Sequence, residues 1–109
     1  MSLADRALSH CDPSSKPLST EEITLLLNDL DDWHLIKEDG THKINKEYKF
    51  KNYSSAQAFA NKVADLAEQE NHHPRVCIEW GKANVCWWTH SIGGLFINDF
   101  IMAARCDEP

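Results

Sequence analysis

The chain has 109 residues, a formal net charge of −6 at neutral pH and a pI near 5.4, and this length predicts one domain with a single hydrophobic core. An acidic chain without a basic patch is not expected to bind nucleic acids or anionic membranes directly. No apolar run is long enough to span a bilayer, no signal peptide is evident and the four cysteines form no disulfide framework, so we expect a cytoplasmic protein.

The N-terminal region is expected to be an arm outside the folded domain. Residues 1–17 end in Asp12–Pro17, a segment rich in serine and proline that favours turns over regular structure. We therefore place an arm or linker at 1–17 and the domain at 18–109. The first helix of that domain has a clear start, because Ser19 and Glu22 have the spacing of a capping box.

Two strands and a second helix follow in order. Trp33–Ile36 is expected to open the first strand, and a turn containing Gly40 leads into the second strand. Ser54 and Gln57 form another capping-box pattern, which predicts the start of the next helix. Apolar residues recur along this helix at helical spacing, and its end carries Glu68.

The segment after this helix is expected to form a β-hairpin. If Gly81 and Lys82 are the central residues of a type II′ turn, Trp80 faces Ala83 and the whole register follows. Side chains alternate between the two faces of a strand, so one face of the hairpin is apolar. This predicted core set is Val76, Ile78, Trp80, Ala83, Val85 and Trp87.

A short last helix, roughly Asn98–Arg105, completes the chain. The elements therefore predict a single α+β domain in the order α-β-β-α-β-β-α. The four strands should form one antiparallel sheet with the helices packed on one face.

The side chains best suited to chemistry lie between Glu68 and Asp99. This stretch contains His72, His73 and His90, and the predicted register, extended beyond the strands, brings His73 opposite His90. Imidazole titrates near neutral pH and a neighbouring carboxylate can fix its tautomer, so the set suits proton transfer. The competing interpretations are zinc binding and a purely structural role. The spacing argues against zinc, because neighbouring histidines diverge in an extended chain and no HxxxH or CxxC pair is present.

The same residues resemble a family motif. The sequence reads Glu68, then His72-His73-Pro74, then Trp80, His90 and Asp99. This pattern is similar to that of the pterin-4a-carbinolamine dehydratases, and the resemblance covers nearly all of the chain after about Leu18. It implies dehydration of 4a-hydroxytetrahydropterin to quinonoid dihydropterin and water in tetrahydrobiopterin recycling, without a metal or a bound cofactor.

The resemblance also implies the roles of individual residues. It assigns catalysis to His72, His73 and His90. It assigns substrate binding or support to Glu68, Asp99 and, more loosely, Trp33. One position departs from the family pattern, because Phe96 stands where a Ser or Thr usually caps the last helix. Either this cap is lost or Asn98 caps a helix that begins later.

The expected partners follow from the resemblance as well. They are a pterin substrate, further copies of this chain in a homodimer or homotetramer, and an aromatic amino acid hydroxylase as a functional link. The alternative function is a non-catalytic dimerisation or coactivator-type binding module on the same fold, since fold does not fix function. The motif retains every histidine and acidic residue here, which favours the enzyme.

Overall fold

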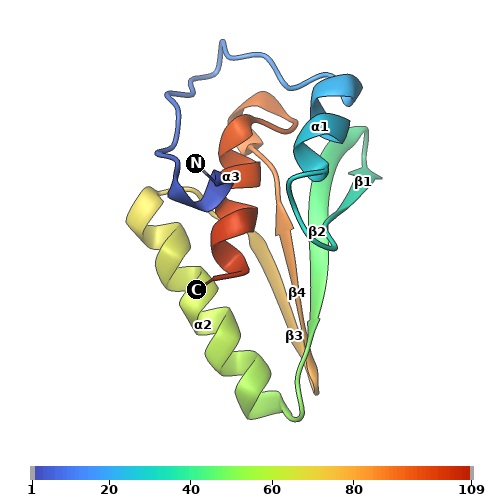
Figure 1. The fold of residues 1–109 in the computed structure, drawn as a ribbon, viewed down its shortest axis with the longest axis vertical. Coiled ribbons are helices and arrows are strands. Elements are labelled where there is room, and N and C mark those ends of the chain that lie inside the picture. Colours follow the sequence, from blue (N-terminus) through green and yellow to red (C-terminus); the bar gives the residue numbers. More distant parts are fainter. Residues whose placement is uncertain (1, 109) are drawn as a thin grey trace.

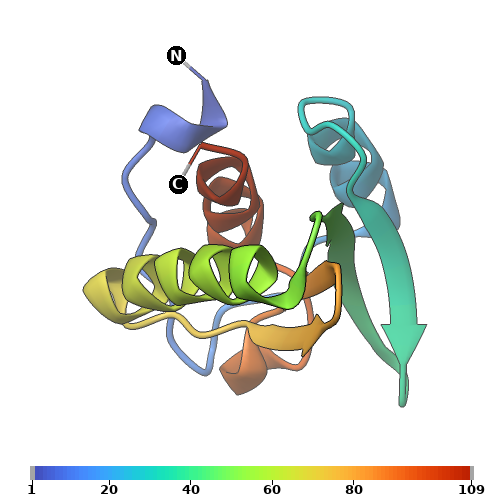
Figure 2. The ribbon, with the colours of Figure 1, turned by 90° about the horizontal axis from the view of Figure 1, so that it is seen from below.

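The computed structural model describes residues 2–108, and within them no helix is long and apolar enough to cross a membrane. A four-stranded antiparallel sheet has the strand order β1-β2-β4-β3, and α2 and α3 pack on one of its faces (Figures 1 and 2). The predicted α+β domain and its element order are therefore confirmed. The elements are η1 (Leu3–Asp5), α1 (Thr20–Leu27), β1 (His34–Glu38), β2 (Thr41–Lys49), α2 (Tyr53–Glu70), β3 (Arg75–Glu79), β4 (Lys82–Trp87), η2 (His90–Ile92) and α3 (Ile97–Cys106).

Side chains cap the first two α-helices. The box predicted for α1 is present, because Ser19 N–H donates to Glu22 Oε1 (2.9 Å) and Glu22 N–H donates to Ser19 Oγ (3.2 Å). The box predicted to begin at Ser54 is wrong. Asn52 caps α2 instead by accepting a hydrogen bond from Ser55 N–H at 2.8 Å, so the helix starts two residues earlier than expected. Asparagine is as favourable as serine at this position.

The β3–β4 hairpin has a different register from the one predicted. Ile78 pairs with Ala83, which leaves Trp80 and Gly81 at the centre of the turn, so the prediction of Gly81 and Lys82 is wrong. Gly81 has a φ of 78° at the second central position, a conformation that type II turns require and glycine adopts without strain. A register shift of two residues keeps the strand side chains on their predicted faces. Trp80 is the exception, because it moves into the turn and is 72% exposed.

The last helix begins without a side-chain cap. Phe96 occupies the N-cap position before Ile97, and its side chain has no oxygen that could accept a hydrogen bond. Of the two alternatives expected from the sequence, the one in which the side-chain cap is lost is therefore correct. The backbone N–H of Phe96 donates to Asp99 Oδ2 at 2.9 Å, which forms one half of a capping box. Asn98 does not cap the helix, because its side chain bonds to the backbone of Ser9.

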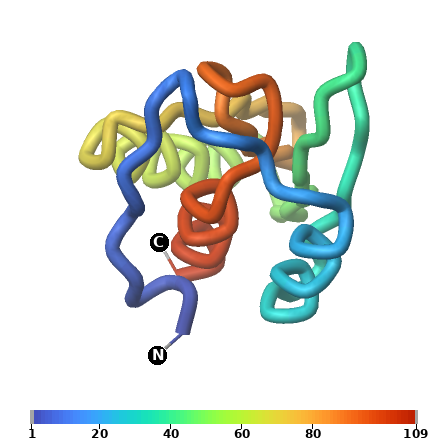
Figure 3. The backbone as a smooth tube through the Cα atoms, turned by 90° about the horizontal axis from the view of Figure 1, so that it is seen from above, coloured from blue at the N-terminus to red at the C-terminus, as the bar shows by residue number. Residues whose placement is uncertain are grey.

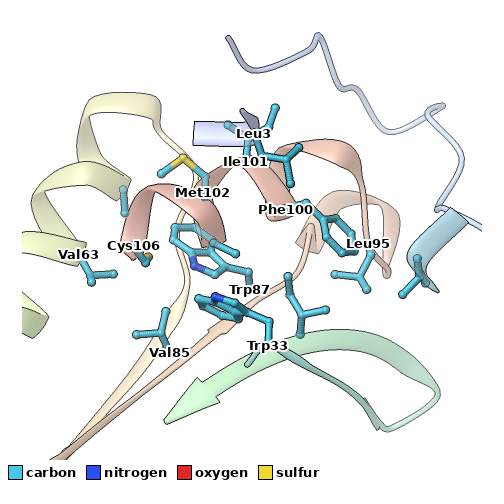
Figure 4. Close-up of a cluster of buried hydrophobic side chains, with 14 residues drawn as sticks. Leu3, Trp33, Val63, Val85, Trp87, Leu95, Phe100, Ile101, Met102 and Cys106 are labelled. Atoms are coloured by element: carbon cyan, nitrogen blue, oxygen red, sulfur yellow. The ribbon is translucent and has the colours of Figure 1, made fainter. Parts of the chain in front are cut away.

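The hydrophobic core lies between the sheet and the helices and centres on Trp87 of β4 (Figure 4). Trp87 is fully buried together with Phe100, Ile101 and Met102 of α3. Each such side chain contributes roughly 1.5–3 kcal/mol when it is removed from water. This packing fixes α3, and therefore Asp99 in its first turn, against the sheet.

A polar cluster ties the other end of α3 to β2. Asp107 accepts hydrogen bonds from Trp33 Nε1 (3.3 Å), Lys46 Nζ (2.9 Å) and Tyr48 OH (2.5 Å). Lys46 also donates to the backbone oxygen of Asp31 at 2.9 Å. Burial and the neighbouring Asp107 carboxylate raise the pKa of the Tyr48 hydroxyl, so it remains a donor.

The N-terminal arm packs along α3 and does not extend away from the domain (Figure 3). Leu3 is buried in the core. Arg105 of α3 donates to the backbone oxygens of Ala4 (3.2 Å) and Arg6 (2.7 Å) and pairs with Glu70 of α2 (3.1 Å). The arm is therefore held by both apolar burial and hydrogen bonds.

The sheet face opposite the helices carries a charged cluster around Trp88. Lys43 Nζ lies 3.9 Å from the centroid of the Trp88 ring. Glu38 accepts two hydrogen bonds from the Arg75 guanidinium (2.9 and 3.2 Å) and one from Lys43 (2.9 Å). These bonds, led by those from Arg75, lower the pKa of Glu38 from 4.5 to about 2. Charged side chains of the chain itself thus cover the aromatic residue on this face.

Removing Asp107 should destabilise the protein. Asp107→Ala is expected to lower the free energy of unfolding by about 1–3 kcal/mol, because three donors lose their common acceptor. Glu108→Ala is the matched control, since Glu108 is an exposed neighbouring carboxylate. Urea unfolding followed by tryptophan fluorescence measures both variants. Equal midpoints for the two would contradict a structural role for the Asp107 cluster.

The Glu38 cluster should make stability depend on pH in acid. The pKa of Glu38 is lower in the folded chain, so its contribution is complete above about pH 4.5 and is lost as the pH falls toward about 2. Glu38→Gln should therefore be less stable at pH 6 and show a shallower fall of the urea midpoint between pH 4.5 and 2. Glu47→Gln, opposite Asn84 on the same face, should keep the wild-type slope. A wild-type slope in Glu38→Gln would contradict the assignment.

Candidate active site

The turn after α2 directs two adjacent histidines to different environments. Asn71 ends the helix with a φ of 50°, a left-handed conformation that asparagine tolerates better than most residues. His72 N–H then donates to the backbone oxygen of Ala67 at 3.1 Å. The side chain of His72 is 16% exposed, whereas that of His73 is 52% exposed.

Asp99 is fully buried and binds His72. Asp99 Oδ1 lies 2.7 Å from His72 Nε2. Asp99 Oδ2 accepts hydrogen bonds from Thr89 Oγ1 (2.7 Å) and from Phe96 N–H (2.9 Å). A carboxylate only accepts hydrogen bonds, so this contact assigns a proton to Nε2 and leaves Nδ1 of His72 for other partners. Three donors offset the cost of burying the carboxylate.

Trp87 sets the plane of the His72 ring. The two rings stack with their centroids 5.5 Å apart and their planes inclined by 18°. Stacking on one face and a hydrogen bond at one edge together restrict rotation of the imidazole. His72 is therefore preorganised by fully buried neighbours.

The second histidine and carboxylate pair is more open to solvent. His73 Nε2 lies 2.5 Å from Glu68 Oε1, which belongs to the last turns of α2. The Glu68 side chain is 78% exposed. Exposed pairs of this kind add little stability. The pair can nevertheless orient His73 at the pocket.

The third histidine comes from the loop between β4 and α3. Thr89 N–H donates to the backbone oxygen of Gly94 at 2.8 Å, which closes this loop around η2. His90 is exposed, and its ring centroid lies 4.4 Å from that of Trp88. The loop thus carries His90 to the same side of the molecule as the turn after α2.

One pocket joins these two segments. It has a volume of about 440 Å³, which suits a small ligand, and all three histidines line it together with Asn71, Thr89 and Ser91. Glu68 and Asp99 support the pocket through their contacts with His73 and His72. The structure therefore brings together five of the six site residues expected from the sequence.

Trp33 is the sixth, and it lies elsewhere. Its ring is buried and its Nε1 donates to Asp107, eight residues beyond Asp99 and so about 12 Å farther along the axis of α3. Trp33 does not line the histidine pocket. Its contacts are those of a core residue, so the expected place beside the substrate is not supported.

The predicted pairing of His73 with His90 is also wrong. In the observed register Arg75 pairs with Cys86, and continuing it would place Trp88 opposite His73. Because the turn lies one residue earlier than predicted, the observed pairing differs from the predicted pairing by two residues. The two histidines approach each other across the pocket and not as cross-strand neighbours.

Sequence reasoning missed two residues that support His72. Thr89 completes the hydrogen bonding of Asp99, and Trp87 stacks on His72. The strand alternation places Trp87 on the core face alone, and an isolated threonine in a loop has no periodic pattern that would single it out. Only their places within three residues of His90 in the chain could have drawn attention to them.

The described residues do not form the ligand set that the zinc interpretation requires. Between residues 2 and 108, no group of three His, Cys, Asp or Glu side chains is arranged as metal ligands. Each acidic residue of the site is instead paired with a single histidine.

Comparison with known proteins assigns the family. The profile described as pterin 4 alpha carbinolamine dehydratase matches residues 16–109. This chain belongs to the pterin-4-alpha-carbinolamine dehydratase family. A relative from Marinobacter nauticus with a provisional pterin-4-alpha-carbinolamine dehydratase name is 52% identical over 106 residues, which cover 97% of this chain and 96% of that protein.

Solved structures support the family fold. The crystal structure of a transcriptional coactivator/pterin dehydratase from Brucella melitensis matches with a TM-score of 0.76 and 32% identity, over 85% of this chain and 97% of that one. A pterin dehydratase-like protein identified as a RuBisCO assembly factor in the alpha-carboxysome matches with a TM-score of 0.60 over 72% of this chain and 88% of that one. At 22% identity, the second likeness concerns the fold alone.

Replacing Asp99 with asparagine should change the tautomer of His72. Thr89 and Phe96 both donate on one side of Asp99, so the amide oxygen should take that side and the amide NH₂ should face His72. His72 Nε2 must then accept a hydrogen bond, which moves its proton to Nδ1. Long-range ¹H–¹⁵N NMR spectra of the imidazole rings distinguish the two tautomers.

Glu68→Gln is the matched control for this experiment. It makes the same chemical change in the exposed pair and should leave the His72 tautomer unaltered. Asp99→Asn should also lower the free energy of unfolding by about 1–3 kcal/mol, whereas Glu68→Gln should change it by less than about 0.5 kcal/mol. A protonated Nε2 on His72 in Asp99→Asn would rule out this account of the site.

Proposed function

We propose that this chain catalyses the dehydration of 4a-hydroxytetrahydropterin to quinonoid dihydropterin and water, in tetrahydrobiopterin recycling. The observation that carries the proposal is the convergence of His72, His73 and His90 on one pocket in a chain of the pterin-4-alpha-carbinolamine dehydratase family. The substrate would come from an aromatic amino acid hydroxylase, which is the functional partner we expect.

The reaction needs an acid and a base in the same site. One group donates a proton to the 4a-hydroxyl as the C4a–O bond breaks and water leaves. Another group removes the proton from N5, and the N–H electron pair becomes the second bond between C4a and N5. One imidazolium and one neutral imidazole can perform both transfers, and the two proton changes on the protein cancel. A positioned acid or base contributes roughly 10²- to 10⁴-fold in rate.

The three histidines differ in ways that suit this division of work. His72 is fixed by Asp99 and Trp87, so its Nδ1 has a defined position relative to a bound ring. His73 and His90 are more exposed and can exchange protons with water. We therefore assign the acid and base roles to the three histidines together.

The proposal includes no metal and no bound cofactor, because proton transfer alone completes the reaction. It includes a homodimer or homotetramer, as the family resemblance implies. The exposed Trp80 at the hairpin turn is compatible with a contact between copies.

The alternative is a non-catalytic binding module of the coactivator type. The name of the Brucella melitensis structure, which pairs a transcriptional coactivator with a pterin dehydratase, is the observation that keeps this function in consideration. A non-catalytic binding module would not need the buried hydrogen bonds that orient His72. Their presence supports the enzyme.

The deciding measurement is the rate of dehydration of 4a-hydroxytetrahydropterin, generated in place by a hydroxylase and followed by ultraviolet absorbance. Wild-type protein treated with a chelator should accelerate the reaction. No acceleration by folded protein would favour the binding module, and acceleration that requires added zinc would favour a metal site.

Substitution of single histidines tests the site assignment. His72→Ala and His90→Ala should each lower the dehydration rate at least tenfold while the fold is retained, because each removes a proton-transfer group. His34→Ala is the matched control, since His34 lies on β1 and its ring pairs with Asp32 outside the pocket. Wild-type rates in both pocket variants would refute the assignment.

A further inference from the structure

The N-terminal arm passes beside the histidine pocket and lines one side of a second, partly open cavity. This cavity has a volume of about 280 Å³. Leu8, Ser9 and Cys11 of the arm form one wall, and His72, Ser91 and Asn98 contribute to the opposite side. Figure 3 shows the arm running around α3 before it enters α1. The segment therefore lies close to the pocket although it is more than 60 residues away in sequence from His72.

The two cavities adjoin each other. Asn71, His72, Thr89 and Ser91 line both of them. His72 is thus a shared wall, with the other histidines on one side and the arm on the other. A ligand held against His72 in the first cavity therefore lies next to the second cavity.

The arm is held in this position by a two-point contact. Ser9 N–H donates to Asn98 Oδ1 at 2.7 Å, and Asn98 Nδ2 donates to the backbone oxygen of Ser9 at 2.9 Å. Asn98 is buried and directly precedes Asp99, the residue that orients His72. The wall formed by the arm is therefore in fixed register with the supporting carboxylate of the site.

Apart from Leu8, the lining of the cavity is polar, includes the Glu70 carboxylate and suits a hydroxylated ligand. Ser9 and Ser91 supply hydroxyls, Asn71 supplies an amide and Cys11 a thiol, and each of these groups can donate or accept hydrogen bonds. In the proposed substrate the reacting atom N5 is bonded to C6, which carries the variable substituent of the pterin. A ring that reacts beside His72 must therefore direct that substituent to the immediate surroundings of His72.

We propose that the arm segment Leu8–Cys11 forms one wall of a specificity subsite for the hydroxylated C6 substituent of the pterin. This inference rests on the proposed dehydratase function and adds to it. The match to the family profile begins at residue 16, so the wall consists of residues that precede the family region. The arm thus contributes to substrate choice, while the histidines contribute the proton transfers.

The test fills the cavity from the arm side. Cys11→Trp places a large ring on the wall, and Cys11→Leu is a smaller change of the same kind. His10→Trp is the matched control, because His10 is the adjacent residue, its side chain is 85% exposed and it does not line the cavity. Dehydration is measured with two substrates, one with a dihydroxypropyl group at C6 and one with a methyl group.

Cys11→Trp should raise KM for the dihydroxypropyl substrate roughly tenfold and change kcat for that substrate by less than about twofold. For the methyl substrate, both KM and kcat should change by less than about twofold, because only the longer group reaches the wall. Cys11→Leu should shift KM in the same direction by less, and His10→Trp should leave both substrates unaffected. Equal effects of Cys11→Trp on the two substrates, or no effect on either, would overturn the proposal. Urea midpoints show that the compared variants are folded.

Binding of unreactive 7,8-dihydropterins with the same two substituents separates the subsite from the reaction. By calorimetry the wild type should bind the dihydroxypropyl compound more tightly than the methyl compound, and Cys11→Trp should abolish that preference. If the wild type shows this preference but no dehydration, the proposed function fails and the subsite stands. If it dehydrates both substrates but shows no preference, the subsite fails and the proposed function stands.

Discussion

The buried carboxylate of Asp99 connects three segments that the chain folds separately. It accepts hydrogen bonds from the N-cap backbone of α3, from Thr89 in the loop after β4 and from His72 in the turn after α2. A carboxylate in the first turn of a helix is also favoured by the helix dipole. A buried carboxylate that loses a donor is costly, so the helix start, the loop and the turn constrain one another. The geometry of the pocket is a consequence of this shared requirement.

This arrangement gives the site one rigid side and one open side. His72 is stacked on a core tryptophan and bound to a buried acid, whereas His73 and His90 face solvent. A fixed imidazole can define where a ring binds, and exposed imidazoles can restore their protonation from water between turnovers. The proposed dehydration requires both properties, because a proton is delivered and another is removed in each cycle.

The helix that carries Asp99 is itself anchored along its length. Asp107 joins its C-terminal end to β2 through Lys46 and Tyr48, and Arg105 binds the arm. Between Asp99 and these polar contacts, apolar side chains of α3 pack on Trp87 (Figure 4). Displacement of α3 would therefore disturb the core, the arm and the site together. The position of His72 thus depends on the packing of the whole domain.

The sequence alone determined the elements, their order and most of the residues that meet in the pocket. Local signals are sufficient for these features, because the capping box at Ser19, the alternation along β3 and the adjacent histidines depend on neighbours in the chain. The hairpin register could not be read in this way. A glycine can stand at either central position of a turn, and the backbone oxygen of Gly81 accepts a hydrogen bond at 2.8 Å from the N–H of Phe50, a residue that follows β2 and lies outside the hairpin. Only the tertiary structure decided that Trp33 donates to Asp107, that Thr89 donates to Asp99 and that the arm lies beside His72. Each of these contacts joins residues from separate segments, and the approach of those segments depends on how the core packs.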